Sequence, residues 1–194
     1  MKTLTFFLAL LMVAGCARSP EKSYYTLREP DQRAGSGRSV TPSYTIAIEA
    51  LTVPESVDRN KMVTRDAQGT RMEISDTARW VEPLTAEIGL KLADDLQKLL
   101  PGVLVSTPGQ ATTPLKPEVS IAMDIRRFDG TLGQGVDVEA VWSCRKKGDA
   151  TTVQSLSSVH ENVEGIDHAA LANAYSRALS RISAAIAKSL PSCR

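Results

Sequence analysis

Cys16 is the first residue of this 194-residue chain whose surroundings indicate a chemistry. A basic residue precedes an apolar run over residues 4–13, and Ala14 and Gly15 lead directly into the cysteine. The run has the length of a secretory h-region and is too short for a spanning helix, which needs about 20 residues. The pattern is typical of a bacterial lipobox, in which the thiol is joined to a diacylglycerol and the chain is cleaved after Gly15. The alternative is an ordinary signal peptide with a chance cysteine at its end.

Lipid at Cys16 would determine where the protein works. The amino group freed by cleavage is usually acylated as well, for example with palmitate, and two or more chains hold a protein stably to a bilayer where one does not. The sequence therefore predicts an envelope lipoprotein with no cofactor beyond this covalent diacylglycerol and N-acyl chain. Ala17 and Arg18 follow, without the Asp that is typical of inner-membrane retention. This favours the periplasmic face of the outer membrane and leaves the inner membrane as the alternative.

Two further cysteines become an even pair once Cys16 carries lipid. Cys144 and Cys193 would then face an oxidising periplasm, in which we expect them to form a disulfide. The bridge would close a loop of about 50 residues, worth roughly 4 kcal/mol in the chain-entropy model. The alternative, a pair of redox-active thiols, lacks the Cys-x-x-Cys spacing.

The remaining polar residues do not form a recognised catalytic motif. His160 and His168 stand alone, without the spacing of a zinc site, and no Gly-x-Ser-x-Gly elbow offers a nucleophile. Gly133-Gln134-Gly135 lacks the strand-to-helix context of a dinucleotide site. The formal net charge of +1 includes Lys2 of the signal, so the mature chain is near neutral, which argues against nucleic-acid binding. We therefore expect neither an enzyme nor a metal site.

The chain divides into a signal peptide over residues 1–15, a lipidated tether over residues 16–43 and one α+β domain over residues 44–194. Proline, Gly35-Ser36-Gly37 and many charges break up the tether. Tyr24-Tyr25-Thr26-Leu27 interrupts it with strong strand formers, and we expect this island to dock on the domain as an edge strand.

Alternating apolar residues predict the strands of the domain. The pattern begins near Tyr44, continues in a hairpin over residues 61–74 with Met62 and Met72 in the core, and includes a short strand over residues 103–105. Three strands over residues 119–126, 136–143 and 151–163 have short connections and predict an antiparallel meander.

Two amphipathic helices complete the prediction. The first begins at Pro83 and ends at Pro101-Gly102. Its apolar stripe is Leu84, Ile88, Leu92, Leu96 and Leu99, and its expected solvated residues are Glu87, Lys91, Asp94, Asp95 and Lys98. The second follows the N-cap Asp167, with Ile166 and Leu171 placed for a hydrophobic staple. The order of elements predicts a single α+β domain, with both helices on one face of an antiparallel or mixed sheet.

One combination of motifs carries a family resemblance. It comprises Cys16, Tyr24-Tyr25-Thr26-Leu27, Ile46-Ala47-Ile48, Val53-Pro54, Asp58-Arg59 and Arg79-Trp80-Val81-Glu82-Pro83-Leu84, with the leucine helix after it. These residues resemble the PqiC (YmbA-like) family of ABC-type transport auxiliary lipoproteins. The segment over residues 79–84 is the most specific part, and the likeness covers nearly the whole mature chain.

The resemblance implies an outer-membrane component of an envelope-spanning lipid-transport system that supports membrane integrity. The implied partners are a PqiB-like MCE-domain tunnel protein and, through it, a PqiA-like inner-membrane protein. A ring-like homo-oligomer is also implied. Tyr24, Tyr25 and Trp80 are the candidate partner contacts. For Trp80 the alternative is a core role, and the two tyrosines could instead pack on the body.

Two other functions stay open at this point. One is a periplasm-facing lipoprotein that carries a lipid in its own pocket, although 5% aromatic residues do not favour a large apolar cavity. The other is an assembly or structural lipoprotein of a secretion system.

Overall fold

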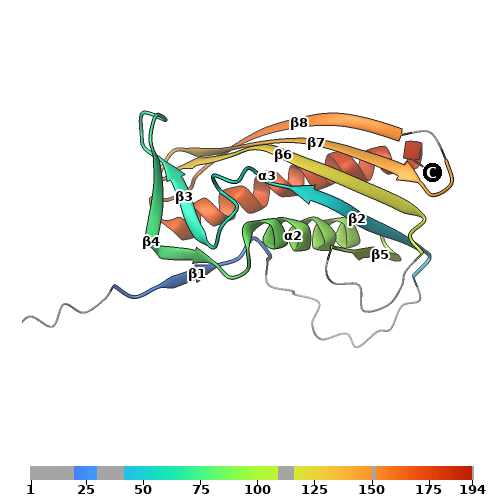
Figure 1. Ribbon diagram of the computed structural model, residues 1–194, viewed down its shortest axis with the longest axis horizontal. Coiled ribbons are helices and arrows are strands. Elements are labelled where there is room, and N and C mark those ends of the chain that lie inside the picture. The colour runs from blue at the N-terminus through green and yellow to red at the C-terminus, as the bar shows by residue number, and fades with distance from the viewer. Residues whose placement is uncertain (1–19, 30–41, 109–115, 150–151, 194) are drawn as a thin grey trace, which may run out of the picture.

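The computed structural model describes residues 20–29, 42–108, 116–149 and 152–193. Two helices lie along one face of a long five-stranded sheet, and a three-stranded sheet packs at one end of the molecule (Figure 1). The predicted α+β domain with both helices on one sheet face is confirmed. The second sheet was not predicted.

The long sheet has the strand order β5-β2-β6-β7-β8. β2 lies parallel to both β5 and β6, whereas β6, β7 and β8 form the predicted antiparallel meander. The strands are β2 (Tyr44–Thr52), β5 (Val103–Ser106), β6 (Val119–Thr131), β7 (Gly135–Lys146) and β8 (Thr152–Asn162).

Alternation along β6 and β7 explains why the helices cover only one face of this sheet. Successive side chains of a strand point to opposite faces, so every second residue can be apolar and buried. The buried residues include Val119, Ile121, Met123, Ile125 and Phe128 of β6 and Val136, Val138, Ala140, Trp142 and Cys144 of β7. Their neighbours on the other face are polar or only half-buried.

The helices are α2 (Leu84–Leu99) and α3 (His168–Ser189), followed by the 3₁₀ turn η2 (Leu190–Cys193). Asp167 caps α3 as predicted, since its side chain accepts a hydrogen bond from the Ala170 amide. The predicted staple is wrong: Ile166 is 86% exposed. It lies against Gly133 in the β6–β7 turn instead of reaching Leu171.

The small sheet has the order β1-β4-β3, with β1 (Ser23–Tyr25), β3 (Lys61–Arg65) and β4 (Met72–Trp80). The hairpin of β3 and β4 is confirmed, but β4 continues to Trp80. Met62 is buried as predicted, whereas Met72 is 37% exposed and the prediction for it is wrong. Met72 starts β4 opposite Arg65, at the outer end of the hairpin.

An aromatic group joins the two sheets to α3. Trp80 meets Tyr175 edge-on with ring centroids 6.3 Å apart, and Phe128 stacks on Tyr175 at 3.9 Å. Burial raises the pKa of the Tyr175 hydroxyl. The small sheet is therefore part of the same hydrophobic core as the long one.

Helix α2 departs from the predicted separation of apolar and charged faces. Lys91 and Asp95 were expected in solvent but are buried between α2 and α3. Lys91 Nζ donates to Asp95 Oδ1 and to Ser180 Oγ of α3, each at 2.7 Å, and Ser180 Oγ donates to Asp95 Oδ2 at 3.0 Å. Leu99, expected on the apolar stripe, is exposed because the helix ends there.

Candidate functional site

The segment next to the lipobox is built into the domain. We call residues 23–27 the N-terminal strap. Its strand β1 pairs in parallel with the end of β4, with Tyr24 opposite Arg79 and Tyr25 opposite Trp80. The Val81 amide also donates to the Tyr25 carbonyl at 2.9 Å. The predicted docking of this segment as an edge strand is confirmed.

Glu87 of α2 holds the other half of the strap, a role that was not predicted from the sequence. Its Oε2 accepts hydrogen bonds from Thr26 Oγ1 at 2.8 Å and from the Leu27 amide at 2.9 Å. Its Oε1 accepts from the Glu82 amide at 3.2 Å, at the start of the helix. Glu87 is only 1% exposed, so it was wrongly expected in solvent. A carboxylate near a helix N-terminus is also favoured by the helix dipole.

A sequence signal for these buried charges exists. Glu87, Lys91 and Asp95 are spaced i, i+4, i+8, directly beside the apolar row of Ile88, Leu92 and Leu96. A charged row at this spacing shares a border with the buried stripe of the helix. Such a row indicates charges that have partners inside the fold.

The three aromatic candidates occupy different environments. Tyr24 is 62% exposed on the outer side of the strap. Tyr25 is half-buried and lies 6.2 Å from His168, ring centroid to ring centroid. Trp80 is 2% exposed, which matches the core alternative weighed for it. Of the three, Tyr24 is the side chain that a partner or a membrane can reach without rearrangement of the core.

An apolar groove runs between the end of β2 and the first half of α2. It has a volume of about 600 Å³, and its lining includes Leu51, Pro83, Gly89, Leu90 and Pro108. Gly89 lines the groove without a side chain, and a Cβ there would make an ordinary contact with Leu51 at 3.5 Å. Glu49 and Glu82 also contribute to the lining. The groove can take an apolar side chain or an acyl chain.

A row of charged side chains crosses from β3 to β8. Arg65 Nε lies 3.0 Å from Asp129, which Arg127 contacts at 2.8 Å. Arg127 also lies 3.3 Å from Asp137, whose other oxygen is 2.8 Å from His160 Nδ1. The hydrogen bond that Asp137 accepts from the His160 ring raises the pKa of His160. The row links four strands, and we assign it a structural role.

The environment of His168 shifts its pKa in the opposite direction from that of His160. His168 begins α3 and is partly covered, and this burial lowers its pKa. Its ring lies near Tyr25 of the strap. Within the described ranges, no three His, Cys, Asp or Glu side chains come together as ligands for a metal ion.

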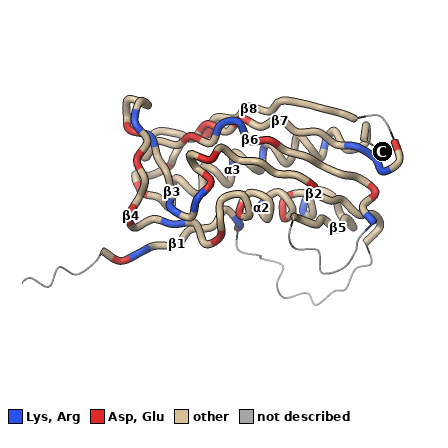
Figure 2. The backbone as a smooth tube through the Cα atoms, in the orientation of Figure 1, with Lys and Arg blue, Asp and Glu red and all other residues tan. Residues whose placement is uncertain are grey.

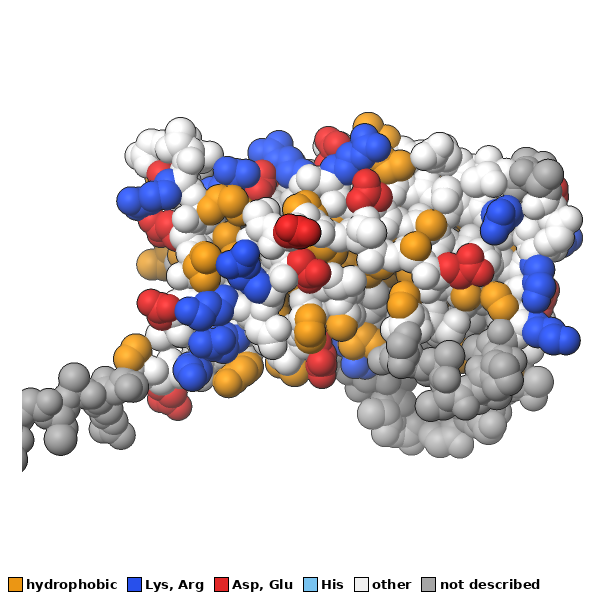
Figure 3. All heavy atoms as spheres, in the orientation of Figure 1, with side chains coloured by type: hydrophobic (Ala, Val, Ile, Leu, Met, Phe, Trp, Pro, Cys, Tyr) orange, Lys and Arg blue, Asp and Glu red, His pale blue; other side chains and the backbone are white. Residues whose placement is uncertain are grey.

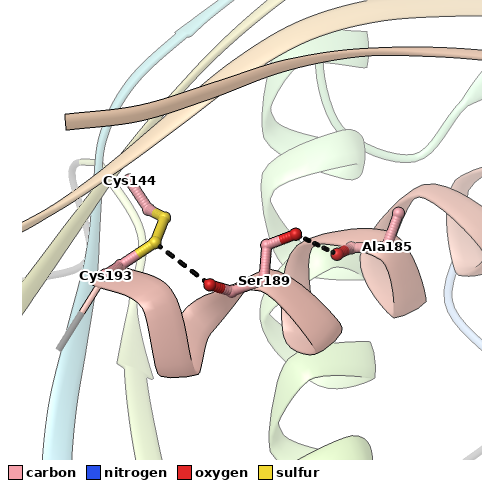
Figure 4. The surroundings of a disulfide bond; sticks show 4 residues. All are labelled: Cys144, Ala185, Ser189 and Cys193. Carbon is pink, nitrogen blue, oxygen red and sulfur yellow. Dashed lines mark hydrogen bonds between the residues drawn. A yellow bond between two sulfur atoms is a disulfide. The ribbon is translucent and has the colours of Figure 1, made fainter.

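Cys144 and Cys193 are brought together at the end of the molecule opposite the strap (Figures 1 and 4). Their Cα atoms are 5.9 Å apart, within the range that a disulfide needs, and the structure joins their sulfur atoms. The bond would attach η2 to β7, and mass spectrometry of the native protein is its test. Cys16 lies outside the described residues. Among the described helices, none is both long and apolar enough to cross a membrane.

Solved structures show the same fold. One crystal structure of an uncharacterized protein has 18% sequence identity and a TM-score of 0.70, covering 88% of this chain and 99% of its own. Another, from Xanthomonas campestris and assigned to the family DUF330, has 16% identity and a TM-score of 0.61, covering 84% of this chain and 92% of its own. No curated protein matches at a significant level.

A family model supplies the assignment. The model described as "ABC-type transport auxiliary lipoprotein component" matches residues 25–187. The matched range extends from the strap to the last turn of α3, and it includes the segment over residues 79–84 that carried the resemblance in the sequence. The chain therefore belongs to the ABC-type transport auxiliary lipoprotein family.

Proposed function

We propose that this protein is an outer-membrane lipoprotein, anchored through Cys16 and facing the periplasm, that docks the MCE-domain tunnel protein of an envelope-spanning lipid-transport system. The observation that carries the proposal is the family match over residues 25–187, directly after a lipobox that ends at Cys16. The proposed partners are a PqiB-like tunnel protein and, through it, a PqiA-like inner-membrane protein. The docking unit is a homo-oligomer of this chain.

The physical arrangement supports a docking role. The strap fixes the chain to the domain through β4 and Glu87, beginning seven residues after Cys16, so a lipid on Cys16 would be attached to a rigid body through a short segment. A docking subunit needs a rigid body and an accessible surface, and it acts by binding rather than by catalysis. Tyr24 and the apolar groove are the accessible features that such a surface would use.

Fractionation and capture test the proposal together. Full-length tagged protein is expressed in its native bacterium, and the inner and outer membranes are separated by density. Partners are captured through the tag after chemical cross-linking. We expect the protein in the outer membrane and an MCE-domain protein among the captured partners. Cys16→Ser serves as the control, since this variant cannot be lipidated and should be absent from both membrane fractions. Recovery of secretion-apparatus proteins in place of an MCE protein would favour an assembly role and contradict the proposal.

The groove favours one second candidate, a lipid-carrying lipoprotein. Its lining and its volume of about 600 Å³ suit an acyl chain. Lipid analysis of purified protein after delipidation and re-exposure to phospholipid would then give stoichiometric bound lipid beyond the anchor. Gly89→Phe, which fills the groove, should abolish this binding, whereas Ala184→Phe on the exposed side of α3 should not. Lipid bound equally by both variants would exclude the groove.

A further inference from the structure

The docked strap leaves a short connection between the lipid and the domain. Only seven residue steps separate Cys16 from Ser23, where β1 begins. Fully extended, seven residues span about 25 Å. The 13-residue strand β6 is about 43 Å long, and α3 with 22 residues is about 33 Å long. The connection is therefore shorter than the domain, so the end with the strap stays near the bilayer.

That end is formed by several elements that are far apart in sequence. The start of α3 meets the strap through His168 and Tyr25. The turns of the β3–β4 and β6–β7 hairpins line one hollow, which both Gly69 and Gly135 border. Ile166, just before α3, lies against Gly133 of the β6–β7 turn. The strap, both hairpin turns and the start of α3 thus share one end of the molecule (Figure 1).

Exposed apolar side chains gather at the same end. We define the apolar end cluster as Tyr24, Met72, Ile74, Val81 and Ile166, all of which are exposed. Only two other large hydrophobic residues of the described chain are comparably exposed, Leu99 at the end of α2 and Leu156 within β8. Five of the seven exposed large hydrophobic side chains of the described residues therefore lie at this one end of the molecule.

The charges at this end of the molecule nearly cancel. Residues 20–29 and 55–82 carry seven Lys and Arg against eight Asp and Glu. β3 carries Lys61 and Arg65, whereas β4 carries Glu73 and Asp76 beside Arg79, so both signs occur at this end (Figure 2), and hydrophobic side chains lie among the charged ones (Figure 3). A polybasic patch would be needed for strong attraction to anionic headgroups. Contact between this end and a bilayer would therefore depend on the apolar side chains.

We infer that the apolar end cluster rests on the lipid surface that holds Cys16, so that the domain stands end-on with the Cys144–Cys193 end pointing away from the membrane. The inference rests on the proposed anchoring. Tyrosine and aliphatic side chains insert into the headgroup region, where their apolar parts leave water. The short connection keeps them within reach of it.

Hydroxyl-radical footprinting reads these side chains directly. Full-length lipidated protein is compared in vesicles of phosphatidylethanolamine with phosphatidylglycerol and in detergent micelles. Vesicles should slow modification of Tyr24, Met72, Ile74 and Ile166 about threefold relative to Leu99 and Leu156, because only the first group would leave water. Equal rates in the two groups, or protection of Leu99 and Leu156 instead, would overturn the inference.

Two matched double variants test whether the protection depends on the apolar end cluster or on exposed apolar side chains anywhere on the surface. Ile74→Ser with Ile166→Ser should reduce the protection of Tyr24 and Met72, whereas Leu99→Ser with Leu156→Ser should leave it unchanged. All four positions are exposed, so both proteins should fold, and circular dichroism checks this. Unchanged protection in the first variant would count against the cluster. If the unmodified lipidated protein did not sediment with vesicles, anchoring at Cys16 itself would be refuted. If it sedimented but Tyr24, Met72, Ile74 and Ile166 were not protected, this inference alone would be refuted.

Discussion

The backbone amide of Leu27 donates to Glu87 Oε2 at 2.9 Å, across 60 residues of sequence. Both groups are buried, and the same carboxylate also accepts from Thr26 and from the Glu82 amide. One side chain thus fixes the strap and the start of α2 together. It converts the segment after the lipobox from a loose connection into part of the domain.

Glu87→Ala should weaken this junction. The substitution leaves the buried Leu27 amide without its acceptor, and we expect a loss of about 2 kcal/mol in the free energy of unfolding. Amide exchange at Leu27 should accelerate, because the strap opens locally before the domain unfolds. Glu164→Ala, at an exposed glutamate, should change stability by less than about 0.5 kcal/mol. Unchanged exchange at Leu27 in the first variant would contradict the role of Glu87.

Lys91→Met should be among the most destabilising changes in α2. It leaves Asp95 buried without its cation, and breaking a buried pair by removing one partner costs about 3 kcal/mol or more. Lys98→Met removes an exposed lysine that faces Glu29 and should have almost no effect. Urea unfolding of both variants measures the difference, and equal midpoints would show that the pair is not buried.

Alkylation tests the cysteine pair directly. Alkylation of unreduced native protein should label neither Cys144 nor Cys193, and labelling after reduction should modify both. Replacement of both by serine should cost about 2–4 kcal/mol, since a long loop is then released in the unfolded chain. Two alkylated thiols in the unreduced protein would rule out the bridge.

The two histidines should titrate on opposite sides of their ordinary value of 6.5. Asp137 raises the pKa of His160, so its stabilising contribution is present below pH 6.5 and is lost as the pH rises through the raised pKa. Burial lowers the pKa of His168, so the contribution of its neutral form is present above pH 6.5 and is lost as the pH falls.

Proton NMR of the imidazole rings follows both titrations. Asp137→Asn should move the midpoint of His160 toward 6.5 and leave that of His168 unchanged, because the two residues have different neighbours. Coincident midpoints in the unmodified protein would contradict the described environments.

Local patterns in the sequence predicted most elements, for identifiable reasons. Alternation along β6 and β7 encodes which face is buried, and Asp167 is placed to cap a helix whatever surrounds it. The strap was also recognisable, because Tyr24 and Tyr25 are strong strand formers within a polar segment.

The errors concern where each element ends relative to its neighbours. Met72 and Ile166 are apolar in sequence but lie at the end of the molecule, where no helix covers them. Glu87 and Lys91 are charged but face partners that come from 60 and 89 residues away. A local pattern carries no information on such distant partners, so the junction at Glu87 became visible only in the fold.

Lipid on Cys16 is the claim on which the account depends most. Intact-mass analysis of the protein purified from native membranes tests it, with Cys16→Ser as the control. The account predicts a mature chain that begins at Cys16, carries a diacylglycerol and an N-linked acyl chain, and sediments with the outer membrane. A chain that lacks fatty acid and stays in the soluble fraction after gentle lysis would contradict it.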